Sequence, residues 1–248
     1  MCEHFTRCGG CKWQTMDYQS QVFYKQKQVK DNLERIAHLD CSNMLPILPS
    51  ENQKEYRNKL EYTFSTKSWK EVYDKTVEDQ GAFGFHVPGF FDKVLEIEYC
   101  GLQKSPSNEI RNHLREYCRN RQLSFYDIRN HQGLMRNLII RTSSTGDLMV
   151  VVVFAIQSEE IIPLLEEIKT KFPQITSLMY CVNEKFNDTL GDQDILLYSG
   201  KDHIEEVMTT FDGEGQLRFK IRPKTFYQTN SAQAERLYHQ AAEFAGIT

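Results

Sequence analysis

Residues 1–14, MCEHFTRCGGCKWQ, decide how the rest of the chain must fold. Cys2, Cys8 and Cys11 fall within this stretch in a C-x5-C-x2-C pattern, with two glycines between the last two cysteines. Because glycine lets the backbone curl tightly, several thiolates can converge on one centre, which is typical of metal or cluster ligation. Three thiolates leave such a centre one ligand short, so we expect a fourth ligand from elsewhere in the chain.

Cys100 is the best candidate for that ligand, because it ends the strand-like run at 95–100 and is followed by glycine. Its use requires residue 100 to fold back onto the N-terminus. The centre would be an iron–sulfur cluster on four cysteines, or a tetrahedral zinc with His4 replacing one thiolate. A disulfide framework is disfavoured, since seven cysteines is an odd number and a chain of 248 residues does not need disulfide bonds for its stability.

The composition, at 40% hydrophobic, is sufficient for a full core. The longest apolar run, at 149–156, is too short to span a membrane and predicts a buried strand. We therefore expect a cytoplasmic monomer with no membrane partner. A net charge of −4 argues against indiscriminate binding to nucleic acid, although a local basic stripe suffices to recognise one RNA site.

The periodicity of apolar residues predicts an α+β fold with a mostly antiparallel sheet, flanking helices and the N-terminal cysteine-rich segment. Helices are expected at 17–37, 106–121, 158–171 and 231–245. Strands are expected at 56–64, 82–87, 90–99, 134–143, 147–155, 176–183, 194–199 and 216–222. The strand at 147–155 is apolar on both faces and should be central in the sheet. Ser144-Thr145-Gly146, between it and the strand at 134–143, is a hairpin signal.

Three parts of the chain are expected. The first is a cysteine-rich segment with its helix at 1–45, and the second is a central α+β domain for RNA recognition at 46–230. The third, at 231–248, is a linking helix that is expected to lead into a further domain.

The clearest charge pattern lies in the stretch 216–224. Basic and apolar residues alternate there, so a strand would have one cationic and one apolar face; the basic residues are Arg218, Lys220, Arg222 and Lys224. Such a face could follow an RNA backbone, or it could protect a sheet edge from aggregation. Arg57 and Lys59 of the first strand are further candidates for RNA contact.

Two other patterns have more than one reading. Arg111, Arg115 and Arg119 recur every fourth residue on the helix at 106–121, which suits either an anionic partner or a solvated face. In the segment 226–230, FYQTN, Gln228 would from sequence alone be only a loop amide. Phe226 and Tyr227 could stack on a base, although core packing is the commoner role of such aromatics.

Several segments together resemble the iron–sulfur-containing RNA 5-methyluridine methyltransferases, which use S-adenosylmethionine to methylate C5 of a uridine. The matching segments are CEHFTRCGGCKWQTMDYQSQVFYKQKQV, YRNKLEYTFS, GFHVPGFFDKVLEIEYCGLQ, LMRNLIIRTSSTGDLMVVV and KTFYQTN. The resemblance implies a [4Fe–4S] cluster on Cys2, Cys8, Cys11 and Cys100, with Gln228 contacting S-adenosylmethionine. It also implies RNA as partner, with 23S ribosomal RNA favoured; the alternatives are a tRNA uracil-C5 methyltransferase or a metal-stabilised RNA-binding module without catalysis.

The resemblance further implies that the chain is an N-terminal and central fragment of the 23S type. In the family, the glycine-rich cofactor loop, the nucleophilic cysteine and the catalytic glutamate lie in a doubly wound domain, which would begin just after Thr248. We therefore expect no catalytic residue in this chain and no activity from it alone. A radical enzyme is disfavoured, because such enzymes use a C-x3-C-x2-C loop.

Overall fold

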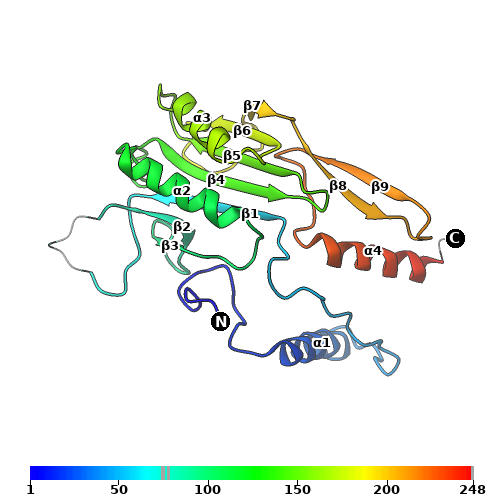
Figure 1. Cartoon of the computed structure of the whole chain (residues 1–248). Helices are drawn as coiled ribbons and strands as arrows, with labels where there is room; N and C mark the ends of the chain where they lie inside the picture. The colour runs from blue at the N-terminus through cyan, green and yellow to red at the C-terminus, as the bar shows by residue number, and fades with distance from the viewer. Residues whose placement is uncertain (74–75, 77–78, 247–248) are drawn as a thin grey trace.

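A computed structural model describes residues 1–73, 76 and 79–246, and its centre is a seven-stranded sheet (Figure 1). The strand order is β3-β2-β1-β4-β5-β6-β7. The strands are β1 (Lys59–Ser65), β2 (Ala82–His86), β3 (Val94–Glu96), β4 (Met135–Thr142), β5 (Leu148–Phe154), β6 (Ser177–Val182) and β7 (Leu196–Gly200). Every neighbouring pair is antiparallel except β5 and β6. The predicted mixture of helices and strands around a mostly antiparallel sheet is confirmed.

Strand β5 is buried along its whole length and lies between β4 and β6, as its two apolar faces predict. The turn before it contains Gly146 at a φ of +87°, a conformation that glycine adopts without strain. Since that turn joins β4 to β5 as an antiparallel pair, the predicted hairpin is confirmed.

Two helices, α2 (Ser107–Asn120) and α3 (Ile161–Lys171), cover one face of the large sheet (Figure 1). Their buried residues, including Ile110, Leu114 and Leu164, join Tyr62 and Val152 in the main hydrophobic core. Helix α3 also connects the parallel pair β5 and β6, because parallel neighbours need a crossover connection.

A two-stranded hairpin of β8 (Ile204–Thr209) and β9 (Gln216–Ile221) lies at the other face, above helix α4 (Ser231–Ala245) in Figure 1. Ile204 and Ile221 pack there with Met149 and Met179 of the large sheet. The sequence did not predict β8, because the middle of its inward face is a carboxylate, Glu206, which interrupts the apolar alternation.

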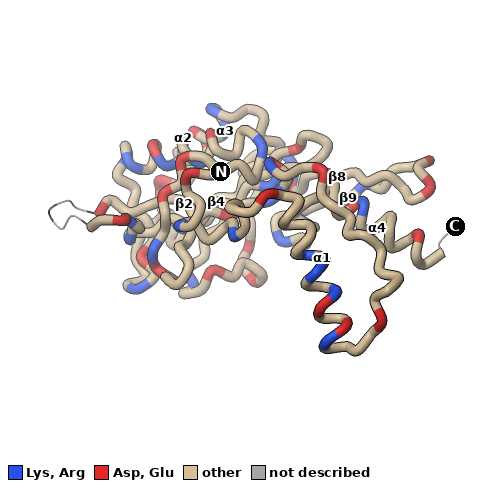
Figure 2. The backbone as a smooth tube through the Cα atoms, turned by 90° about the horizontal axis from the view of Figure 1, so that it is seen from below, with Lys and Arg blue, Asp and Glu red and all other residues tan. Residues whose placement is uncertain are grey.

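Helix α1 (Tyr18–Arg35) projects away from both sheets and has no buried residue (Figure 1). It is attached through segment 45–50, where Gln26 donates to the carbonyl of Leu45 and the Tyr18 hydroxyl accepts from the amide of Ser50. Figure 2 shows both basic and acidic residues along α1, and Lys27 pairs with Asp31 at 2.7 Å. The positive charge of this helix is therefore partly neutralised. The division into parts at 1–45, 46–230 and 231–248 stays a prediction.

No helix among the described residues is long and apolar enough to cross a membrane.

Candidate functional site

The structure brings the N-terminal cysteines into the neighbourhood of Cys100. Cys100 is buried just after β3, Cys8 packs against the main core, and Cys2 and Cys11 are half-buried. Burial raises the pKa of the Cys8 thiol to about 11, and the charges of Cys100, Cys11 and Cys2 add to that rise. The four thiols are therefore close enough to interact electrostatically, although they come from opposite ends of a 100-residue stretch.

Backbone contacts hold the N-terminal segment against the sheet. The Gly9 amide donates to the carbonyl of His86 at 3.3 Å, and a Cβ at this glycine would lie only 3.0 Å from that oxygen. The Glu98 amide donates to Nε2 of His4 at 3.2 Å, two residues before Cys100. That bond occupies Nε2 of His4, which weakens the alternative in which His4 replaces a thiolate through this nitrogen.

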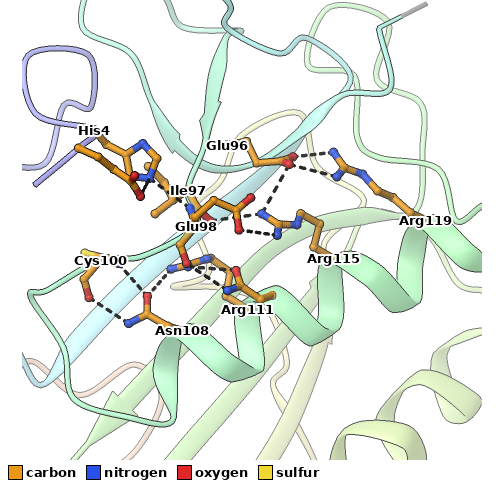
Figure 3. Close-up of polar contacts among 11 residues, drawn as sticks. His4, Glu96, Ile97, Glu98, Cys100, Asn108, Arg111, Arg115 and Arg119 are labelled. Atoms are coloured by element: carbon orange, nitrogen blue, oxygen red, sulfur yellow. Dashed lines mark hydrogen bonds and ion pairs between the residues drawn. The ribbon is translucent and has the colours of Figure 1, made fainter.

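Cys100 is fixed by an amide side chain from α2 (Figure 3). Oδ1 of Asn108 accepts from the Cys100 amide at 2.8 Å, and its Nδ2 donates to the Cys100 carbonyl at 3.1 Å. The same Oδ1 accepts from Arg111 at 2.9 Å. The backbone that carries the Cys100 thiol is therefore set by the first turn of α2.

The arginine row of α2 turns inward rather than toward an external anion. Arg115 lies 3.1 Å from Glu98 and 3.5 Å from Glu96, and Arg119 lies 2.6 Å from Glu96 (Figure 3). Arg111 is fully buried. For Arg115 and Arg119, both predictions, an external anion and a solvated face, were wrong, because Glu96 and Glu98 supply the carboxylates.

In the described part of the chain, no group of three or more His, Cys, Asp or Glu side chains is arranged so that it could hold a metal ion. The cysteine side chains share one neighbourhood without forming a ready-made coordination shell. Their assignment as ligands stays a prediction.

The segment 222–231, which contains Gln228, is held against the large sheet by Arg141 of β4. Arg141 of β4 is 4% exposed and donates from Nη1 to three carbonyls of this segment. These are the carbonyls of Arg222, Pro223 and Thr225, at 3.0, 3.1 and 2.9 Å. A single buried guanidinium therefore fixes the turn that follows β9.

Asn58 holds the second half of that segment. Its amide donates to the Thr229 carbonyl, and its Nδ2 donates to the Gln228 carbonyl and to Oγ of Ser231, all at 2.8 Å. Buried Glu206 accepts from the same Ser231 hydroxyl at 2.9 Å. The Gln228 side chain is left exposed on an anchored backbone, and Phe226 beside it is 81% exposed.

The predicted cationic strand is only partly free of acidic partners. Arg218 lies 3.4 Å from Glu205, and Arg222 lies 3.0 Å from Asp202. For Lys220, no carboxylate of residues 1–73, 76 and 79–246 is within ion-pair distance of Nζ. Leu217 and Phe219 are 51% and 37% exposed, whereas Ile221 is buried, so the predicted apolar face of β9 is open at its first two positions.

Arg57 and Lys59 flank Asn58 and therefore lie next to the segment 222–231. Nε of Arg57 donates to the Lys59 carbonyl at 3.4 Å, and Nζ of Lys59 lies 3.5 Å from Glu61. The structure thus brings these two residues close to Gln228. The Arg57 amide also donates to the carbonyl of Leu102 at 2.8 Å, two residues after Cys100, so Arg57 lies next to the cysteine segment as well.

Four polar residues that position these segments were not predicted from the sequence: the buried Asn58, Arg141 and Glu206, and the half-buried Asn108. The available signal was a charged or amide side chain at an inward position of a strand or helix. Arg141 ends the otherwise apolar run LIIR, and Glu206 lies between Ile204 and Met208 on the inward face of β8. Buried polar groups need partners, so each of these positions predicted a contact.

No family model matches the chain. One solved structure that matches is that of Pyrococcus abyssi tRNA (uracil-54, C5)-methyltransferase in complex with S-adenosyl-L-homocysteine. The TM-score is 0.68 at 24% identity, over 96% of this chain and 50% of that one. The likeness shows that the two chains share this fold.

Curated relatives match along the whole of this chain. Proteins named uncharacterized RNA methyltransferases from Bacteroides thetaiotaomicron and Porphyromonas gingivalis are 52% and 51% identical over 100% of this chain, covering 55% and 54% of their own lengths. One from Chlorobaculum tepidum is 34% identical over 100% of this chain and 52% of its own length. The chain spans about half the length of the curated relatives it matches.

These comparisons correct one expectation, that of a 23S-type fragment without its catalytic domain. The relatives that match the whole of this chain are named RNA methyltransferases, and the matching structure is that of a tRNA enzyme. The comparisons also give no support to the expectation that the chain is inactive.

Proposed function

We propose that this chain works in an S-adenosylmethionine-dependent methyltransferase that modifies C5 of a uridine in a structured RNA. The observation that carries the proposal is the match of the whole chain, at 51% to 52% identity, to proteins named as RNA methyltransferases. The shared fold with a tRNA (uracil-54, C5)-methyltransferase supports it. Either tRNA or ribosomal RNA is compatible with these relatives, so the experiment below tests both.

Within that function, we propose that Cys2, Cys8, Cys11 and Cys100 hold a [4Fe–4S] cluster. The donor types suit such a group, because all four side chains are free thiols and the charges of the other three affect Cys8. A cluster closed by four cysteines offers substrate no open position, so its contribution would be structural. Other residues of this chain would position the ligands. Asn108 fixes Cys100, and the Gly9 amide and His4 fix the N-terminal segment.

For S-adenosylmethionine, we propose Gln228 as a contact. Its side chain is exposed, while Arg141 and Asn58 hold the backbone on both sides of it. A side chain on a preorganised backbone loses little conformational freedom when it binds a ligand, which favours affinity.

Deleting the gene that encodes this chain should abolish 5-methyluridine at one or more sites, in either the tRNA or the ribosomal RNA of its host. A plasmid copy should restore the modification. Nucleoside mass spectrometry on separated RNA fractions, followed by mapping of nuclease fragments, identifies the site. A plasmid carrying Gln228→Ala should restore methylation about tenfold more slowly, since one hydrogen bond to the cofactor is lost.

The matched control for this experiment is Gln174→Ala, an exposed amide in the turn between α3 and β6, which should restore methylation fully. Unchanged 5-methyluridine at every mapped site in the deletion strain would contradict the proposed function. If 5-methyluridine is unchanged in the deletion strain and the purified chain still binds RNA, the chain is an RNA-binding module without catalysis.

For RNA contact, we propose Arg57, Lys59 and the basic residues of 218–224. Lys220 is the sharpest test, because no carboxylate among the described residues neutralises it, whereas Arg218 and Arg222 are paired. Lys220→Gln should weaken binding to an RNA stem-loop in every sequence context and reduce the salt slope by roughly one unit.

Fluorescence anisotropy across a salt series measures that slope. The control is Lys171→Gln, at the end of α3 on the other face of the sheet, which should leave the slope unchanged. If Lys220→Gln also leaves the slope unchanged and instead promotes self-association, the stripe protects the edge of β9 rather than contacting RNA.

A further inference from the structure

Arg111 is a buried cation without an acidic partner. Its side chain is 0% exposed, and its guanidinium donates only to neutral oxygens. These are Oδ1 of Asn108 at 2.9 Å, the Glu98 carbonyl at 2.6 Å and Oδ1 of Asn112 at 3.1 Å. Its Nε is buried and has no hydrogen-bond partner among the described residues.

The other two arginines of the same row provide the contrast. Arg115 and Arg119 both reach Glu96, and Arg115 also reaches Glu98 (Figure 3). No carboxylate of residues 1–73, 76 and 79–246 is within ion-pair distance of Arg111. Burying a charge is costly unless it is paired, so a missing anion is expected nearby.

The Tyr62 ring offsets part of that cost. The guanidinium carbon of Arg111 lies 5.0 Å from the ring centroid, a favourable cation–π geometry. Burial raises the pKa of the Tyr62 hydroxyl, so the tyrosine stays neutral and contributes no negative charge. The neutral ring of Tyr62 therefore compensates only part of the cost of burying the Arg111 charge.

The carboxylate of Glu98 interacts with Arg111 from beyond ion-pair distance, but it is already paired with Arg115 at 3.1 Å. A further anion in this neighbourhood would come from Cys100. Asn108 bridges the two residues, because its Oδ1 accepts from both Arg111 and the Cys100 amide. Arg111 also donates to the carbonyl of Glu98, two residues before Cys100, at 2.6 Å. Four thiolates around a cluster carry a net negative charge, and that charge would sit beside Arg111.

We propose that Arg111 is the buried counter-charge of the four-cysteine site. It is a positioning residue that orders the Cys100 backbone through Asn108 and stabilises the anionic loaded site by its field. The inference rests on the proposed cluster. A nearby positive charge favours the more negative, reduced form of a cluster, so Arg111 should also raise its reduction potential.

The test compares wild type, Arg111→Met, Arg111→Lys and the control Arg121→Met after anaerobic loading with iron and sulfide. Arg121 pairs with Glu160 at the far end of α2. Arg111→Met should lose iron to a chelator at least about tenfold faster than wild type and show a more negative reduction potential. Arg111→Lys should keep the potential near that of wild type, and Arg121→Met should match wild type in both measurements.

Urea unfolding of the metal-free and iron-loaded chains separates this role from simple packing. Arg111→Met leaves three oxygens without their donor whether or not iron is bound, so the metal-free variant should be less stable than wild type, and the iron-loaded variant should lose more stability than the metal-free one. A Met variant with unchanged potential and chelator resistance overturns the inference. Should it fail to fold, Arg111→Gln, which keeps two donors, replaces it. Wild-type chain that takes up no iron would instead overturn the proposed cluster itself, and the inference with it.

Discussion

Replacing Cys100 with Ser is expected to remove the iron from the anaerobically reconstituted chain, from about four irons per chain to background. Cys100 is the ligand contributed by the body of the fold, so its loss leaves only the three thiols of the N-terminal segment. Iron and sulfide analysis on the purified variant measures the effect. The N-terminal segment should also become sensitive to protease, because the cluster ties it to the strand end.

The matched control is Cys41→Ser, a buried cysteine that is not among the proposed ligands. It should keep the full iron content. If Cys100→Ser also keeps its iron, or if wild type binds stoichiometric zinc instead, the assignment of the four cysteines to a cluster is wrong.

Replacing Arg141 with Met should reduce the free energy of unfolding by about 3 kcal/mol, because it removes the donor that serves three carbonyls in a buried location. The 222–231 segment should then open locally, and limited proteolysis should cut it well before the rest of the fold. Urea denaturation gives the global value and timed proteolysis gives the local one. Binding contributed by Gln228 should fall in parallel.

Lys224→Met provides the comparison, since this exposed residue of the same segment makes one hydrogen bond, to the Gly191 carbonyl at 3.1 Å. Its stability should change by no more than about 0.5 kcal/mol. Equal protease sensitivity of the two variants would show that the segment is not held by Arg141.

Apolar periodicity predicted most of the fold, because core-facing strands and helices leave a repeating pattern. The central position of β5 followed from its two apolar faces, and the hairpin before it followed from the turn at 144–146. Element ends were less predictable: β1 begins at Lys59 rather than at residue 56, and β3 is only Val94–Glu96. Strand ends depend on partners in space, which a local pattern does not contain.

Buried charges account for what the sequence did not predict. Arg111 and Arg141 are spaced like surface residues, yet each is enclosed by carbonyls and amides from distant segments. The same limitation hid β8, whose inward Glu206 finds its partner in Ser231, 25 residues away. From sequence alone a charged residue is assigned to the surface, because its partners in the folded chain are not known.

The central structural claim is that the N-terminal cysteines and Cys100 enclose one four-iron cluster. Mössbauer spectroscopy of wild-type chain reconstituted with ⁵⁷Fe tests it most directly. The account predicts that nearly all the iron appears in one diamagnetic four-iron species, with no site open to exchange. A spectrum of two-iron clusters or of loosely bound iron, or a chain that takes up no iron, would contradict it.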